Sequence, residues 1–160
     1  MDELHIRPAT RNDCALMLAL LRELAEYENL LAGFATSEAA IARDFFGPQP
    51  VAYCDLAFEG AEAVGITTFF WTYGSFSTAR GLFLEDLFVR QAFRGRGHGK
   101  RLLAHLADKG AQAGASRLDW LVLDWNKSAM GFYTDIGARR IEDWLPYRLE
   151  GDAMKKLGDL

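Results

Sequence analysis

Cysteine is scarce in this chain, and its two cysteines, Cys14 and Cys54, stand far apart in the sequence. This spacing matches neither a redox CxxC pair nor a set of metal ligands. We expect both to be small core residues in a reducing cytoplasm, and we expect no metal site.

Long apolar runs are absent as well. No stretch approaches the roughly 18 apolar residues that a membrane span needs. The first residues, Met1-Asp2-Glu3, lack the basic region and apolar stretch of a secretion signal. These absences predict a cytoplasmic protein that does not interact with a membrane.

The chain also lacks an excess of positive charge. It has 18 Lys and Arg residues and 22 Asp and Glu residues, which give a formal net charge of −4. General nucleic-acid binders are usually strongly basic, so we expect no nucleic-acid partner. The sequence shows no repeat, low-complexity tract or linker. With 160 residues, half of them hydrophobic, residues 1–160 are predicted to form a single domain.

Hydrophobic periodicity predicts a mixed β-sheet covered by helices, an α/β fold with the element order β-α-α-β-β-β-α-β-α-β-β. Helices are predicted at Thr10–Glu28, at Ser37–Phe45, from the glycine-rich segment 94–100 to between Gly110 and Gly114, and at Asn126–Ile136. Strands are predicted at His5–Pro8, Val51–Phe58, Ala63–Tyr73, Gly81–Val89 and Arg117–Asp124, with two short ones at Arg139–Ile141 and Tyr147–Leu149.

A glycine-rich segment between a strand and a helix is the most informative motif. It reads Arg94-Gly95-Arg96-Gly97-His98-Gly99-Lys100. Glycine lets a backbone approach an anion closely, and a helix N-terminus presents free N–H groups to it. The cationic side chains add charge that suits phosphate. The segment therefore predicts a pyrophosphate site.

Two common phosphate loops are excluded by the residues themselves. A Walker A motif would need glycine at Arg94 and a hydroxyl residue at Arg101. A dinucleotide fingerprint would need glycine at Lys100 and a place in the first βα unit. What remains is Arg-x-x-Gly-x-Gly, formed by Arg94, Gly97 and Gly99.

This pattern, in this order of elements, resembles the acetyl-CoA loop of the GNAT N-acetyltransferases. Further motifs along nearly the whole chain resemble the diamine acetyltransferases of that superfamily, which include the spermidine/spermine and thialysine enzymes. These motifs are Ile6-Arg7-Pro8-Ala9-Thr10, Glu23-Leu24-Ala25-x-Tyr27-Glu28, Leu84-Glu85-Asp86-x-Phe88-Val89, Trp125-Asn126 and Phe132-Tyr133-x-x-x-Gly137-Ala138.

The resemblance implies the GNAT fold, whose strands splay at the acetyl-CoA site, and acetyl-CoA as co-substrate. Its pantetheine arm would pair with the backbone of Leu87, Phe88 and Val89 as an added strand. An N–H near Leu87 could stabilise an oxyanion. The other expected acetyl-CoA contacts are Arg94, Gly95, Arg96, Gly97, His98, Gly99, Lys100 and Asn126. From its position alone, Asn126 is first a helix cap.

Two residues are candidates for catalysis. The resemblance makes Tyr133 the general acid, which would protonate the departing thiolate, and Glu85 the base, acting directly or through water. Read without the family, Tyr133 could equally pack beside Phe132, and Glu85-Asp86 could be a solvent-exposed pair at a sheet end. Neighbouring strand residues face opposite ways, so both acids reach one site only if a β-bulge turns one of them.

The amine substrate is expected to contact Tyr27, Glu28, Glu85, Asp86, Asp119 and Trp120. Glu28 could instead be a surface acid and Trp120 a core residue. His5 and His105 have no evident partner and are expected at the surface. Gly74-Ser75-Phe76 and Asp143-Trp144-Leu145-Pro146 depart from the polyamine enzymes, which weakens the case for spermidine.

The leading hypothesis is an acetyltransferase that acts on a small cationic amine in a direct ternary complex: a diamine, a polyamine or a thialysine-like compound. No cysteine lies near the motifs to carry the acyl group. The alternatives are a non-catalytic acyl-CoA sensor and a GNAT enzyme for another amine, such as an aminoglycoside, a protein lysine or a protein N-terminus. The resemblance also implies a homodimer.

Overall fold

The computed structural model describes residues 3–160. The chain divides into two compact units, the first ending at Leu121 and the second comprising Val122–Leu160. Each unit is described by itself.

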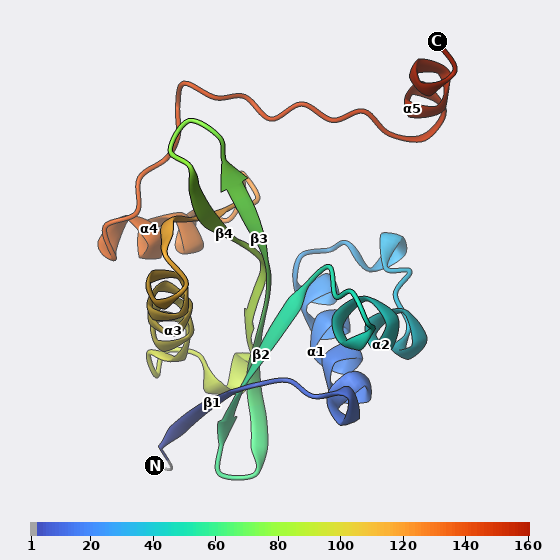
Figure 1. Ribbon diagram of the computed structural model, residues 1–160. Helices are drawn as coiled ribbons and strands as arrows, with labels where there is room; N and C mark the ends of the chain where they lie inside the picture. The colour runs from blue at the N-terminus through green and yellow to red at the C-terminus, as the bar shows by residue number, and fades with distance from the viewer. Residues whose placement is uncertain (1–2) are drawn as a thin grey trace. The chain divides into compact units, whose positions relative to one another are not determined.

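The first unit is built on a five-stranded sheet in the order β1-β2-β3-β4-β5 (Figure 1). Its strands are β1 (Leu4–Pro8), β2 (Tyr53–Glu59), β3 (Glu62–Gly74), β4 (Ala79–Val89) and β5 (Ala115–Trp120). The first four pair antiparallel, whereas β4 and β5 pair parallel. The mixed sheet and the β2–β3 hairpin are as predicted.

Helices cover both faces of this sheet. α1 (Cys14–Tyr27) and α2 (Glu38–Phe46) lie on one face and α3 (His98–Gln112) lies on the other (Figure 1). Alternating residues of β2 serve the two sides: Leu56 packs with Met17 of α1, and Ala57 packs with Leu102 of α3. Single 3-10 turns occur at Arg11–Asp13, Leu31–Gly33 and Gln91–Phe93.

Local capping signals explain where the first helices begin. The Asp13 carboxylate accepts hydrogen bonds from the backbone N–H of Thr10 (2.7 Å) and from its hydroxyl (2.9 Å). The Ser37 hydroxyl accepts one from the N–H of Ala40 at the start of α2. These starts agree with the helices predicted from Thr10 and from Ser37. Short polar side chains are favoured there because they satisfy N–H groups that have no partner within the helix.

Strand β4 has an irregularity where its acidic residues lie. Its register with β3 passes from Thr68 opposite Asp86 to Phe69 opposite Leu84, which leaves Glu85 as an extra residue, a β-bulge. Pairing with β5 ends at Leu84 and Trp120, just before the bulge. Beyond the bulge, β3 is the only described strand that pairs with β4, so the other edge of β4 is open. This opening between β4 and β5 is the splay that the resemblance implies.

This early end of pairing corrects the predicted strand Arg117–Asp124. The strand ends at Trp120, and Leu121 is exposed. The apolar run that follows was interpreted as a buried strand, but the bulge in β4 ends the ladder that would have held it.

The second unit contains α4 (Lys127–Asp135) and α5 (Gly151–Gly158). The predicted strands Arg139–Ile141 and Tyr147–Leu149 are wrong, since residues 139–149 form no strand. A strand persists only when its N–H and C=O groups find a partner, and no described strand pairs with this segment. Among residues 3–160, no helix is long and apolar enough to cross a membrane.

Candidate active site

The glycine-rich segment forms the N-terminus of α3. Gly97 is the residue before the helix and has φ +81°, and Gly95 has φ +76°, a region that side chains other than glycine rarely adopt. A Cβ built at either glycine would meet no atom within 4 Å. The space over the loop is therefore open, and the residues fit a bound pyrophosphate.

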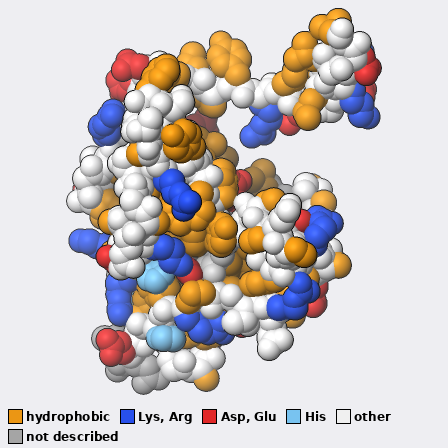
Figure 2. Space-filling model, in the orientation of Figure 1, with side chains coloured by type: hydrophobic (Ala, Val, Ile, Leu, Met, Phe, Trp, Pro, Cys, Tyr) orange, Lys and Arg blue, Asp and Glu red, His pale blue; other side chains and the backbone are white. Residues whose placement is uncertain are grey.

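The cationic side chains of this loop are held by neighbouring groups. Glu59 accepts a hydrogen bond from Arg96 (2.8 Å) and contacts Nε2 of His98 (2.6 Å). His98 is buried, so its contact with Glu59 fixes the start of α3 in place. Lys, Arg and His side chains gather on the visible face over α3 and the segment before it (Figure 2).

Arg94 connects the loop with the end of α1. It donates a hydrogen bond to the carbonyl of Val89 (2.9 Å). Its guanidinium lies 4.2 Å from the ring centroid of Tyr27. Tyr27, predicted to contact the amine, therefore supports the Arg94 side chain.

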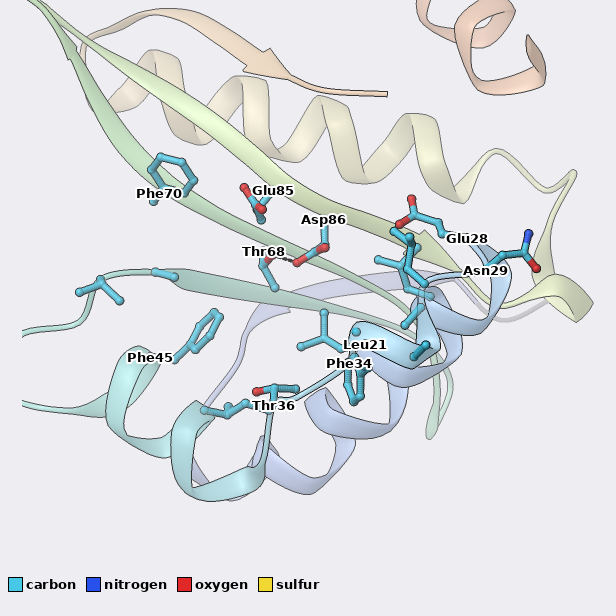
Figure 3. A pocket seen from close by; sticks show the side chains of 18 residues that line it. Leu21, Glu28, Asn29, Phe34, Thr36, Phe45, Thr68, Phe70, Glu85 and Asp86 are labelled. Carbon is cyan, nitrogen blue, oxygen red and sulfur yellow. Dashed lines mark hydrogen bonds between the residues drawn. The ribbon is translucent and has the colours of Figure 1, made fainter. Parts of the chain in front are cut away.

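The bulge brings both acidic residues of β4 to the same cleft. Glu85 and Asp86 line a cleft of about 900 Å³, together with Glu28. Figure 3 shows the β3 and β4 side chains along one side, and Leu21, Phe34, Thr36 and Phe45 along the other. Three residues predicted to contact substrate are thus collected at one place, in a volume suited to a small molecule.

Burial and mutual repulsion act on the acids of this cleft. Burial raises the pKa of Asp86, and a hydrogen bond donated by the Thr68 hydroxyl opposes that rise. The pKa of Glu28 is raised by burial first and then by the negative charge of Asp86. Where these acids are ionised, their mutual repulsion favours a bound cation, and a raised pKa suits a group that accepts a proton.

The other predicted amine contacts lie elsewhere. Asp119 on β5 forms an ion pair with Arg117 at 2.8 Å. Trp120 stands opposite Leu84 in the β4–β5 register. Neither is among the described residues that line the cleft, so their proposed contact with substrate stays a prediction.

The second unit carries the remaining two candidates. The Asn126 side chain accepts a hydrogen bond from the N–H of Ala129 (3.2 Å), which confirms its role as the cap of α4. Tyr133 lies within α4, and its ring centroid is 5.4 Å from that of Phe132. Packing and catalysis are compatible, because packing uses the ring and catalysis would use the hydroxyl.

The sequence interpretation missed several residues that shape the site. Thr68 and Phe70 of β3 and Phe34 after α1 line the cleft, and Glu59 holds the loop. Thr67-Thr68 interrupts an apolar strand and could have been noticed as a polar signal. His105, expected at the surface without a partner, instead lies 3.1 Å from the buried carboxylate of Asp55, which also binds Lys109. Adjacent elements α3 and β2 create this cluster, which no local pattern reveals.

Comparison with known proteins agrees with this geometry. The model of the acetyltransferase (GNAT) family matches residues 15–138. The chain belongs to the GNAT family. It is 36% identical to the thialysine N-epsilon-acetyltransferase of Sus scrofa, over 98% of each chain. It is also 27% identical to an L-ornithine N5-acetyltransferase of Arabidopsis thaliana, over 97% of this chain and 88% of that one.

A solved structure supports the fold assignment. An integron cassette protein from V. cholerae superimposes with a TM-score of 0.83 at 27% identity, covering 98% of both chains. The mixed sheet and its flanking helices are thus those of a GNAT protein, and the chain is an N-acetyltransferase. Among residues 3–160, no group of three or more His, Cys, Asp or Glu side chains could hold a metal ion.

Proposed function

We propose that this GNAT enzyme transfers the acetyl group of acetyl-CoA to the primary amine of a small cationic substrate, by direct attack in a ternary complex. The observation that carries the proposal is the bulge at Glu85. It directs two acidic side chains to the same cleft. It also leaves one edge of the following β4 residues without a partner among the described strands. A cation site and an open strand edge therefore lie next to each other.

Acetyl-CoA would supply the acetyl group on a thioester. The loop residues and the N-terminus of α3 would hold its pyrophosphate, with Arg94 and Arg96 already oriented by Val89 and Glu59. The backbone of Leu87, Phe88 and Val89 would hold the pantetheine arm along the open edge. Asn126 is proposed as a further contact.

The amine must lose one proton before or during attack, and the departing sulfur must gain one. We assign the first transfer to Glu85, directly or through water, with Asp86 and Glu28 holding the ammonium group. We assign the second to Tyr133, whose phenol carries its proton at neutral pH. The second proton, which the nitrogen loses as the amide forms, restores the Tyr133 phenol directly or through water. Ammonium and thioester thus give amide, thiol and one released proton, without an acyl-enzyme.

A free-thiol release assay tests this proposal. Acetyl-CoA is combined with a panel of diamines, polyamines, thialysine and aminoglycosides, and each acetylated product is verified by mass spectrometry. Amine-dependent thiol release is expected. Tight acetyl-CoA binding without release from any amine or peptide would favour the alternative, an acyl-CoA sensor.

A further inference from the structure

The charges that line the cleft have one sign. Glu28, Glu85 and Asp86 carry carboxylates, and none of the described residues lining the cleft is Lys, Arg or His. The other polar side chains there are those of Asn29, Thr36 and Thr68. In Figure 3 the three acids lie above Leu21 and Phe34, which belong to the apolar side.

Cationic side chains near the cleft are committed elsewhere. Arg90 donates to Glu23 (2.7 Å) and to the carbonyl of Ala63 (2.8 Å). Arg94 donates to Val89 and lies over Tyr27. Neither lines the cleft, so neither offsets the charge of its acids.

Glu28 and Asp86 already repel each other, and this repulsion adds to the effect of burial in raising the pKa of Glu28. A substrate carboxylate would add a further negative charge, and the described residues that line the cleft offer no cation to pair with it. Its desolvation in a partly apolar cleft would be uncompensated, and a site rejects groups that it leaves unpaired. An ammonium group, in contrast, relieves the repulsion.

From this we infer that the cleft selects amines that lack a carboxylate, such as alkyl diamines, over the basic amino acids from which they derive. This specificity would differ from that of the two relatives described above, whose names specify thialysine and ornithine. The inference rests on the proposed function and deepens it, with Glu28 as the specificity-determining residue.

Matched substrate pairs test the inference with the full chain. The pairs are 1,5-diaminopentane with lysine, 1,4-diaminobutane with ornithine, and bis(2-aminoethyl) sulfide with thialysine. Within each pair only the carboxylate differs. We expect kcat/KM to be at least about tenfold higher for the member without it, at pH 8 and low salt. Equal or higher kcat/KM for the amino acids would overturn the inference while leaving the acetyltransferase function intact.

A variant of Glu28 tests whether this residue causes the preference for amines that lack a carboxylate. Glu28→Gln should reduce the ratio within each pair several-fold, because it removes a negative charge beside the substrate. Glu26→Gln is the control, since Glu26 is an exposed acid in the last turn of α1, two residues before Glu28, and does not line the cleft. A ratio that Glu28→Gln leaves unchanged, or that Glu26→Gln lowers equally, would contradict the role of Glu28.

Binding measurements keep the inference testable if turnover fails. Without thiol release from any amine, the proposed function fails, and calorimetric titration of the same pairs still compares their affinities. Tighter binding of the diamines then supports the selection inferred from the cleft. Equal or tighter binding of the amino acids refutes it.

Discussion

Asp86 is subject to two opposing effects, burial that favours its neutral form and a hydrogen bond from Thr68 that favours its carboxylate. Because its pKa in the fold is raised, ionised Asp86 persists only above that raised value. Holding an ammonium group requires the ionised form. Thr68 therefore acts as a positioning residue that keeps Asp86 charged at lower pH.

The pH profile tests this role of Thr68. Thr68→Val removes the donor, so the pKa of Asp86 should rise further and the acidic limb of kcat/KM should move to higher pH. On that limb we expect a loss of roughly 2–10-fold, the effect of one hydrogen bond. Thr68→Ser keeps the hydroxyl and should restore the profile. An equal loss at every pH in Thr68→Val would instead point to a packing defect.

Residues differ in how far sequence alone predicts their place. Glu85 and Asp86 were recognisable because two acids interrupt an apolar strand, and a bulge followed as one way to bring them together. Thr68 stood out only as a polar residue in an apolar strand, and Phe70 did not stand out at all. Both reach the cleft through a cross-strand register that no local pattern encodes. Glu59 was missed because it is distant in sequence from the loop that it anchors.

Helix α3 packs against the sheet and begins at the loop proposed to bind acetyl-CoA. A Cβ at Gly99 would meet only a Leu87 methyl carbon, at 3.9 Å, and a Cβ at Gly110 would meet Ala115 at 3.6 Å. Neither position has a positive φ, so alanine is compatible with both. The fold therefore has space for a methyl group at Gly99.

Gly99→Ala should stabilise the fold and weaken acetyl-CoA binding at the same time. Reduced freedom of the unfolded chain predicts a gain of about 0.4–1 kcal/mol, measured by denaturant unfolding. The added methyl group would occupy the proposed pyrophosphate space, and we expect at least a tenfold weaker affinity by calorimetry. Gly110→Ala, in the same helix, should stabilise without weakening binding. Normal affinity in Gly99→Ala would remove this helix end from the cofactor site.

Elements were predictable where capping residues, periodicity and turns agree. Ser37, Asn126 and the glycines before α3 indicated helix starts correctly. The strands at residues 139–149 were wrong, and β5 ends early. A strand depends on a partner from elsewhere in the chain, so alternation alone does not determine whether it forms.

At the scale of the whole molecule, the proposed chemistry divides its residues between the two units. Glu85 and the phosphate loop belong to the first unit, and Tyr133 belongs to the second. The family match spans both, from residue 15 to residue 138. On the proposed mechanism, turnover depends on a residue of the second unit, whereas the loop proposed to bind pyrophosphate belongs entirely to the first.

Tyr133→Phe separates these two contributions. The substitution keeps the aromatic ring beside Phe132 and removes only the hydroxyl, so the packing within α4 should persist. Loss of a general acid predicts a fall in kcat of about 100-fold or more, with acetyl-CoA affinity unchanged within roughly twofold. Tyr147→Phe removes the same group from the same unit and should leave kcat at the wild-type value. Unchanged turnover in Tyr133→Phe would assign protonation of the leaving thiolate to another donor, such as water, and would reduce Tyr133 to its packing role.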